Sequence, residues 1–506
     1  MVSMNSKTSF LGAEIIDRQN SGSFPLFLFS IGFQIALSLI ALLLMGFHFG
    51  TSDEYCRLWY SIEWLRSPFL APEDHIWLGG NFWILGLILF LVGDPVWAGI
   101  LHGLVSGTCC IAAAWFFSRT IGAAPLEATF ACALITTRPI FLALSKSSQP
   151  GLFFLACFFL AGASLAKHFQ KNPITWDSPS SWLVMGTLCV IASQTLRYEG
   201  WFLSVPWGLL LLYFFLACIY RKKWEGSLRW MALGVTISIF PLIWLFDAKR
   251  VLGSWTTFIS SYAQTLIDST PHLNLADPFY RALFHPFYTL WQLPDLWVFA
   301  IWGLVVVLLK GNTGSRMGVL LWIALALILE TMTTLKGTGK NWPFRYVICF
   351  VGPMALLAGM GMFDLFRRVR NRSLAKALFV GVICLDLIIN MRLAPVITKG
   401  SPPTTDMEYV AVGKVIRRLS QEGNIRKTIV LREPFEEGYW DFERWVIAVH
   451  AGLQYEVSSR RSEKQWQNFL QRPYGKYAVT AGPELKDKRF RFIPTHTKRV
   501  KLYTLD

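Results

Sequence analysis

Long apolar runs separated by short polar segments dominate the sequence. The first extends from Phe24 to Phe49, immediately after a polar N-terminal tail of residues 1–23. A helix needs about 20 apolar residues to cross a bilayer, so the runs predict spans at 24–49, 95–118, 124–142, 149–166, 182–196, 200–220, 228–247, 294–310, 317–335, 343–363 and 375–392. We therefore expect an α-helical polytopic membrane protein with about 11 transmembrane helices.

Composition agrees with a membrane environment. The chain of 506 residues is 53% hydrophobic and only 16% charged, whereas soluble domains carry about 25% charged residues. The nine cysteines lie mostly inside apolar runs and show no CxxC spacing. Neither a zinc site nor a disulfide framework is therefore indicated. No small-residue cleavage site follows the first run, so we interpret it as a retained anchor and not as a signal peptide.

Basic residues predict the orientation. If the N-terminus is cytoplasmic, the inner loops are short and rich in Lys and Arg, as the positive-inside rule requires. These loops hold Arg119, Lys167, His168, Lys171, Arg221, Lys222, Lys223, Lys310, Arg316, Arg367, Arg368, Arg370, Arg372 and Lys376. An odd number of spans then places the C-terminus outside. Counting the apolar segment Ile76–Val92 as a further span would invert every later loop, so we prefer a re-entrant or interfacial segment there.

The segments expected outside the membrane are the loops 50–94 and 248–293 and the region 393–506. The second loop is either an amphipathic flap or a packed cover. Residues 394–506 hold about twenty Lys and Arg against about thirteen Asp and Glu. Expected strands at 428–431 and 477–480 and helices at 409–420 and 463–470 predict a small extracytoplasmic α/β domain. Its basic surface suits anionic lipid head groups or acidic glycans, or is simply solvated. The net charge of +16 requires no nucleic-acid partner.

Asp53 and Glu54 form an acidic pair immediately after the first span. The expected outer ends of other spans collect further ionisable residues, which are costly at membrane depth and persist where they pair or line a water-filled cavity. Arg197, Tyr198 and Glu199 interrupt an apolar stretch from Trp182 to Tyr220. They form either a salt bridge at a tight turn between helices or the wall of a cavity that faces the acidic pair.

Four segments together resemble the GT-C membrane glycosyltransferases, the superfamily of the protein O-mannosyltransferases and the aminoarabinose-to-lipid-A transferases. They are Thr51-Ser-Asp-Glu-Tyr55, His75 with Gly93-Asp-Pro-Val-Trp97, Ser145-Lys-Ser-Ser-Gln-Pro150, and Pro343-Phe-Arg-Tyr-Val-Ile348. The resemblance covers roughly residues 24–392. The sequence departs from the family pattern in two places. The turn at 145–150 has no acidic residue, and no proline pair follows His75.

The resemblance implies a sugar donor linked to a polyprenyl phosphate and an acceptor that is a lipid, a glycan or a protein. Asp53 would serve as general base, and Glu54 would orient the acceptor or hold a divalent metal, the one cofactor considered. One acidic pair is too few ligands to specify a metal site. Donor-phosphate candidates are Arg345, Lys340, Lys336 and Arg138, for each of which snorkelling to the interface is the alternative. Residues expected to line the acceptor cavity are His75, Arg197, Tyr198 and Glu199.

Two other classes of function compete with an enzyme. One is a flippase or transporter of lipid-linked sugars, and the other is an accessory subunit of a glycan assembly complex. Transporters often show internal repeats and broken helices at the midplane. This sequence shows no repeat between its halves, and its charges gather at one face. We therefore favour an enzyme that works among membrane lipids, expected in the bacterial inner membrane.

Overall fold

The structure is a computed structural model. It describes residues 23–45, 52–72, 77–170, 178–255, 284–336, 347–398, 404–421, 428–432, 442–451, 456–460, 476–481, 490–495, 497 and 500–505. The helices of the bundle are α2 (Ser23–Met45), α3 (Ser52–Arg66), α4 (Gly80–Val92), α5 (Pro95–Thr120), α6 (Pro125–Thr136), α7 (Pro139–Leu144), α8 (Gly151–Gln170), α9 (Ser181–Leu196), α10 (Tyr198–Tyr220), α11 (Trp224–Leu252), α14 (Phe284–Gln292), α15 (Trp297–Lys310), α16 (Thr313–Lys336), α18 (Ile348–Arg368) and α19 (Arg372–Thr398).

Every expected span contains a helix, and the protein is a multi-pass membrane protein. Within the described ranges, eight helices are long and apolar enough to cross a bilayer: α2, α5, α8, α10, α11, α16, α18 and α19. Helices α14 and α15 are separated by a short break at which the chain bends by 108°. If the two count as one broken span, the protein has a ninth span in the described ranges. The expected spans at 124–142 and 182–196 correspond to the shorter apolar helices α6 and α9. The polytopic helical fold is therefore confirmed, with fewer full-length helices than the expected eleven.

Proline explains one difference from the expected spans. The stretch 124–142 was expected as a single helix, but the structure divides it into α6 and α7 on either side of Thr137 and Arg138. Pro139 occupies the first position of α7, and Arg138 before it is extended, with ψ of 130°. A proline offers no backbone N–H and disfavours the helical conformation of the residue before it. The chain therefore turns at Arg138.

The hard-to-place segment 76–92 forms α4 from Gly80 onward. Its 13 residues extend about 20 Å at the helical rise, less than the ~30 Å hydrocarbon core. Gly93 ends α4 with a left-handed φ of 72°, and the Asp94 side chain caps α5 by accepting from the Trp97 N–H at 3.0 Å. Such a sharp reversal needs glycine. The short length of α4 favours a re-entrant or interfacial helix over a span.

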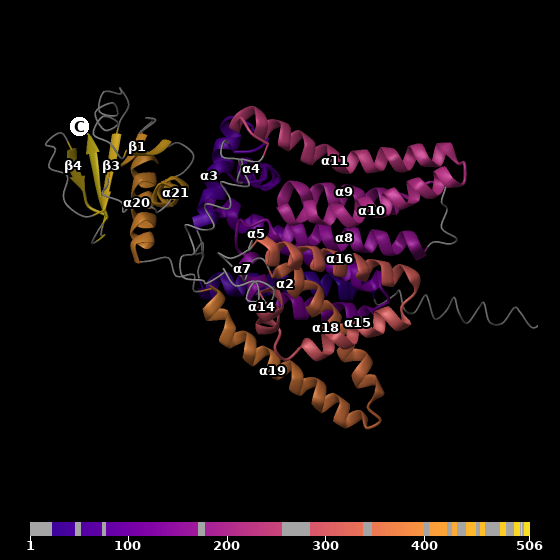
Figure 1. Ribbon diagram of the computed structural model, residues 1–506. Helices are drawn as coiled ribbons and strands as arrows, with labels where there is room; N and C mark the ends of the chain where they lie inside the picture. Colours follow the sequence, from indigo (N-terminus) through magenta and orange to yellow (C-terminus); the bar gives the residue numbers. More distant parts are fainter. Residues whose placement is uncertain are drawn as a thin grey trace, which may run out of the picture.

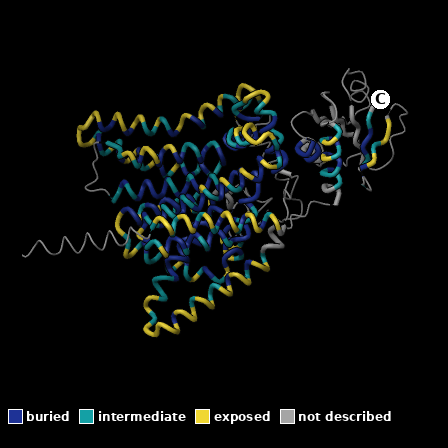
Figure 2. Tube along the Cα trace, turned by 180° about the vertical axis from the view of Figure 1, so that it is seen from behind, coloured by how far each residue is buried: buried dark blue, intermediate teal, exposed yellow. Residues whose placement is uncertain are grey.

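The two ends of the bundle differ. Figure 1 shows α3, α4 and the C-terminal domain at one end, with the turn from α10 to α11 at the opposite end. That turn carries Arg221, Lys222 and Lys223. Figure 2 shows that exposed positions follow the outward faces of α11 and α19, where Leu242 on α11 and Leu385 on α19 are examples of exposed apolar side chains. These faces are suited to contact with lipid.

The C-terminal region contains α20 (Thr404–Gln421), α21 (Phe442–Ala451) and a five-stranded sheet of order β2-β1-β3-β5-β4. The strands are β1 (Thr428–Arg432), β2 (Glu456–Arg460), β3 (Lys476–Ala481), β4 (Phe490–Ile493) and β5 (Val500–Leu505). Strand β1 pairs in parallel with β2 and β3, whereas β5 is antiparallel to β3 and β4. The expected strands at 428–431 and 477–480 are confirmed as β1 and β3, and the expected helix 409–420 is confirmed within α20. The helix expected at 463–470 lies outside the described residues.

The C-terminal domain docks directly on α3. One apolar cluster joins Leu58 and Ile62 of α3 to Val412 of α20 and Val446 of α21, all of them buried. Two polar contacts at the edge of this cluster also hold the C-terminal domain against the bundle. The Tyr55 hydroxyl of α3 lies 3.4 Å from Nε2 of His450 in α21. Arg417 of α20 pairs with Asp94, the cap of α5, at 2.5 Å. The helix that begins with the acidic pair is thus held from outside the bundle as well as from within.

Candidate active site

The acidic pair opens a helix. Asp53 and Glu54 are the second and third residues of α3, which begins at Ser52, and not part of an irregular loop. Carboxylates are favoured in the first turn of a helix, where free amide groups and the helix dipole attract negative charge. The Glu54 side chain is buried, with 6% exposed, while the side chain of Asp53 lies outside the described part of the structure. The first turn of α3 therefore presents a buried carboxylate to the bundle.

The polar turn between α7 and α8 lies against this first turn. The Ser148 hydroxyl donates to the Glu54 carbonyl at 3.0 Å, a contact between residues 94 positions apart. Lys146 is only 8% exposed and is close enough for Glu54 to act on its charge. Burial lowers the pKa of the Lys146 ammonium, and the Glu54 charge raises it. The turn expected at 145–150 is therefore a buried neighbour of the acidic pair.

Helices α2, α4 and α5 hold this turn in place. The Asn81 amide donates to the Ser148 carbonyl at 3.1 Å, and Nδ1 of His102 donates to the Ser147 carbonyl at 3.3 Å. The hydroxyl groups of Ser38 and Ser145 bond at 2.8 Å. A Cβ atom at Gly103 would lie 2.6 Å from the Ser145 carbonyl oxygen, so only glycine lets α5 approach the turn this closely. Three helices thus satisfy the polar groups that burying a turn requires.

The Arg197–Glu199 segment joins the same region. Arg197 forms an ion pair with Glu199 in which Nε donates to Oε2 at 3.0 Å, and both side chains are largely buried. The Arg197 guanidinium also lies over Gly151, where a Cβ atom would be 3.5 Å from it. At the same junction, α4 meets α9 so closely that a Cβ atom at Gly80 would lie 2.2 Å from the Thr195 hydroxyl. Both interpretations of this segment, a salt bridge at a turn and a wall of the site, are compatible with this placement.

Arg138 lies in a separate buried cluster. Its guanidinium forms an ion pair with Asp386 of α19 and donates through Nε to the Leu134 carbonyl at 2.9 Å. Asn390, one turn further along α19, donates to Asp386 at 3.1 Å. The contacts fix α19 to the break between α6 and α7. Four other predicted groups lie outside the described residues: His75, Lys340, Arg345 and the side chain of Lys336.

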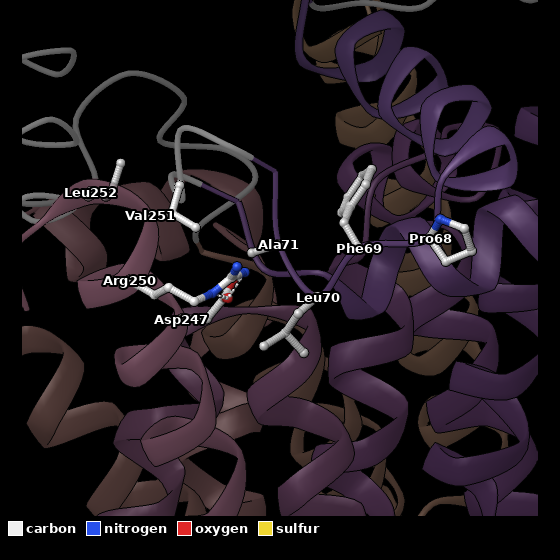
Figure 3. A pocket seen from close by; sticks show the side chains of 8 residues that line it. All are labelled: Pro68, Phe69, Leu70, Ala71, Asp247, Arg250, Val251 and Leu252. Atoms are coloured by element: carbon white, nitrogen blue, oxygen red, sulfur yellow. Dashed lines mark hydrogen bonds and ion pairs between the residues drawn. The ribbon is translucent and has the colours of Figure 1, made fainter.

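A cavity of about 660 Å³ opens between the loop after α3 and the C-terminal end of α11. Figure 3 shows the side chains that line it, with Asp247 and Arg250 beside one another below Ala71; the two are paired at 2.6 Å. No residue of the acidic pair or of the turn 145–150 lines this cavity. Leu70, Ala71 and Leu252 of its lining belong to a cluster in which Tyr198 also meets Trp201 and Trp244 edge-on, with ring centroids 5.5 and 6.0 Å away.

The described side chains contain no group of three or more His, Cys, Asp or Glu residues arranged to hold a metal ion. Glu54 is described, but Asp53 contributes no described side chain to that search. A carboxylate pair alone offers few of the six or more oxygen ligands that hard divalent cations take. The divalent metal considered at Asp53 or Glu54 stays a prediction.

Sequence reasoning missed three groups that surround the turn. Asn81 and His102 are fully buried, and the turn contacts each of them. Lys146 was part of the segment 145–150 quoted for the family resemblance but received no role. Away from the turn, His285 of α14 was also missed; its ring stacks on Phe350 with centroids 4.7 Å apart, and the Glu199 charge acts on it. A single ionisable or amide side chain inside an apolar run was the available signal, because such groups need partners at membrane depth.

Comparison with known proteins supports the fold. No protein-family model matches the sequence, and no curated protein matches it either. Among solved structures, the crystal structure of ArnT from Cupriavidus metallidurans bound to undecaprenyl phosphate is similar, with a TM-score of 0.53 and 11% identity over 90% of this chain and 93% of that chain. The apo structure of the same ArnT gives a TM-score of 0.51 and 12% identity over the same shares. The chain therefore shares the fold of ArnT over nine-tenths of its length, in agreement with the fold expected from the four short motifs.

Proposed function

We propose that this protein is a glycosyltransferase that moves a sugar from a polyprenyl-phosphate-linked donor to an acceptor on the extracytoplasmic face of the membrane. One observation carries the proposal. In a fold similar to that of ArnT, which binds undecaprenyl phosphate, the acidic pair opens α3 and a buried lysine lies beside it. A carboxylate for the acceptor and a cation for the donor phosphate are the two groups that this reaction needs.

The proposed chemistry assigns Asp53 as general base. Asp53 accepts the proton of the acceptor hydroxyl while the hydroxyl oxygen bonds to the anomeric carbon. The bond from that carbon to the donor phosphate oxygen breaks, and its electron pair leaves with the polyprenyl phosphate. Glu54, buried beside the turn, orients the acceptor. Basic groups stabilise the charge that grows on the phosphate, most strongly in a site shielded from water. Arg345, Lys340 and Lys336 are the candidates for that role on the segment before α18.

We propose that the acceptor binds on the side of the site where Tyr198 lies. This residue lies between Arg197 and Glu199 in the sequence and belongs to the apolar cluster that also contains Leu70 and Ala71 of the cavity wall. The loop that lines the cavity, Pro68–Ala71, leads directly toward His75 in the sequence. Aromatic rings with polar edges suit a ligand that has both apolar and hydroxyl-bearing faces. An acceptor approaching along this side would meet Arg197 and Glu199 before the acidic pair.

The orientation of the chain follows the same proposal. The acidic pair and the C-terminal domain share one end of the bundle, and the basic turn from α10 to α11 lies at the other (Figure 1). Under the positive-inside rule, the first end is extracytoplasmic and the N-terminus is cytoplasmic. A bacterial inner membrane is the proposed location.

The test is Asp53→Asn, which keeps the shape of the side chain and removes the proton acceptor. Purified protein would be given a panel of undecaprenyl-phosphate-linked radiolabelled sugars together with a membrane lipid extract, and sugar transfer would be measured. General-base catalysis contributes about 10²–10⁴-fold, so turnover should fall by that order while binding of undecaprenyl phosphate persists. Glu63→Gln is the matched control, since Glu63 is an exposed residue of the same helix paired with Arg66. Unchanged turnover in Asp53→Asn would remove Asp53 from the mechanism.

A further inference from the structure

A second cluster of buried polar groups lies at the bend between α14 and α15, the two halves of the broken span. Gln292 is the last residue of α14 and is fully buried, and Asp295 follows it within the bend. The two carboxylate oxygens of Asp295 and the two polar atoms of the Gln292 side chain are buried, and none has a hydrogen-bond partner among the residues that the structure describes. Unpaired polar groups are costly at membrane depth, so these atoms require a polar partner.

Two other elements of the bundle meet this bend at Arg138. Its Nη1 donates to the backbone carbonyl of Gln292 at 3.4 Å, and the same guanidinium forms the ion pair with Asp386 of α19. Asp386 and Arg138 are also close enough to Asp295 for their charges to act on it. The break between α6 and α7, the bend between α14 and α15, and α19 therefore converge on one buried site.

Further oxygen atoms of this site lack a partner. They are Oδ1 of Asp386 and Oδ1 of Asn390, for which the described part of the chain supplies no hydrogen bond. Asn390 is only 6% exposed, and its amide donates to the other carboxylate oxygen of Asp386 at 3.1 Å, so its side chain is aimed into the site. Carboxylate and amide oxygens are the ligands that hard cations prefer. Asp295, Asp386, Asn390 and Gln292 provide both kinds.

The charges of the site favour a monovalent cation. Asp295 and Asp386 carry two negative charges when both are ionised, and Arg138 supplies one positive charge, so one negative charge is left over. One positive charge neutralises the site, whereas a divalent ion would leave an excess positive charge in a medium that solvates it poorly. A proton shared by the two carboxylates would also neutralise the site, but it would not satisfy the amide oxygens of Asn390 and Gln292.

We propose that an alkali metal cation binds among Asp295, Asp386 and Asn390. Membrane transporters bind sodium at comparable breaks in a helix, where side chains and unwound backbone supply oxygen atoms. The cation ties the bend between α14 and α15 to α19, just as Arg138 ties α19 to the break between α6 and α7. The site contains neither the acidic pair nor the turn 145–150, so the inference goes beyond the proposed sugar transfer and does not depend on it.

Thermal unfolding of the purified full-length protein tests for the cation. Melting temperatures are measured in sodium, potassium and choline chloride at equal ionic strength, and in choline chloride with added magnesium or calcium. A ligand that binds only the folded state stabilises it increasingly as its concentration exceeds Kd. The melting temperature of the wild type should therefore rise with the concentration of sodium or potassium, and not with that of choline.

Two variants assign the effect to this site. Asp295→Asn removes a charged ligand and leaves the Arg138–Asp386 ion pair in place. A contact with a charged group is strong, so the sodium concentration needed for half of the stabilisation should rise about ten-fold or more. Asn390→Leu removes an amide oxygen and changes no charge, and it should shift the same concentration in the same direction. It provides the comparison if Asp295→Asn does not fold.

Asp364→Asn is the matched control, because Asp364 is a partly exposed carboxylate that pairs with Lys310 at 3.2 Å and Arg368 at 2.8 Å. It should keep the sodium dependence of the wild type. The inference is wrong if sodium, potassium and choline give the same melting temperature, or if Asp295→Asn and Asn390→Leu both respond to sodium like the wild type. Stabilisation by magnesium or calcium alone would also overturn it, since the site would then be divalent. A wild type that gains stability only as the pH falls, with no effect of sodium, would replace the cation with a shared proton.

Discussion

Protonation of His450 should loosen the C-terminal domain from α3. Burial lowers the pKa of His450 to about 4, with Lys414 adding to this effect, Asp94 opposing it and Arg417 adding to it. The ordinary value is about 6.5. Protonation of His450 is therefore easier when the C-terminal domain has moved away from α3 and the ring is in water. Acidic pH favours this open state over the docked one. The stability of the docked form is complete above about pH 6.5 and is lost as the pH falls toward 4.

The size of the effect follows from this shift in pKa. Between pH 7 and pH 5, a histidine whose pKa is about 4 when docked and about 6.5 when open costs the docked form about 2 kcal/mol. The open population should rise by about 20-fold. His450 is 8% exposed, so solvent screens this cost little. The contact most affected is the one with the Tyr55 hydroxyl, 3.4 Å away.

Hydrogen exchange of the α21 and α3 amides would measure this opening, with rates corrected for the intrinsic pH dependence of exchange. His450→Gln is the control, because glutamine keeps a polar group opposite Tyr55 and does not titrate. The wild type should lose protection in α21 between pH 7 and pH 5, and His450→Gln should not. Equal changes in both proteins, or none in the wild type, would refute the assignment of this opening to His450.

Three further predictions concern orientation and the basic candidates. A cysteine at Lys222 should resist an impermeant thiol reagent in intact cells, whereas one at Ser401 should react; the opposite pattern would overturn the orientation. Arg345→Ala should weaken undecaprenyl phosphate binding ten-fold or more, and Arg345→Lys should restore it only in part; an unchanged affinity with a lower melting temperature would make Arg345 structural. Breaking a buried ion pair costs about 3–5 kcal/mol, so Asp386→Ala should lower thermal stability sharply. The paired change Arg138→Met with Asp386→Leu should recover stability, and if it also keeps donor affinity, Arg138 is no phosphate ligand.

The long helices were predictable because a bilayer leaves few alternatives. Each backbone polar group must be paired within the hydrocarbon core, so an apolar run of sufficient length has to be helical. Elements outside that constraint were less predictable. Helix α3 combines polar and aromatic residues and carries little apolar periodicity, and its helical state depends on packing against α4 and α21. Strands β2, β4 and β5 were not expected, since each is short and is defined by its pairing with a distant strand.

The acidic pair could be found because its position after the first span is itself a signal. Its surroundings could not be found in this way. The contact of Ser148 with Glu54 joins residues 94 positions apart, and hydropathy contains no information on which helices meet. The close approach at Gly103 is equally invisible, because a glycine in a membrane helix has many uses. Only the assembled bundle shows that Lys146 lies close enough to Glu54 for the two charges to interact.

Consecutive residues of α3 serve two sides of the molecule. Glu54 faces the turn that carries Lys146, and Tyr55 faces His450 of the C-terminal domain. Neighbouring positions of a helix point about 100° apart, so a single rigid turn connects the two contacts. A displacement of α21 removes the His450 contact from Tyr55, the residue next to Glu54, whose backbone carbonyl accepts from Ser148. We therefore expect the docking of the C-terminal domain to affect the geometry of the proposed site through this one helical turn, and the opening assigned to His450 is the perturbation that would reveal it.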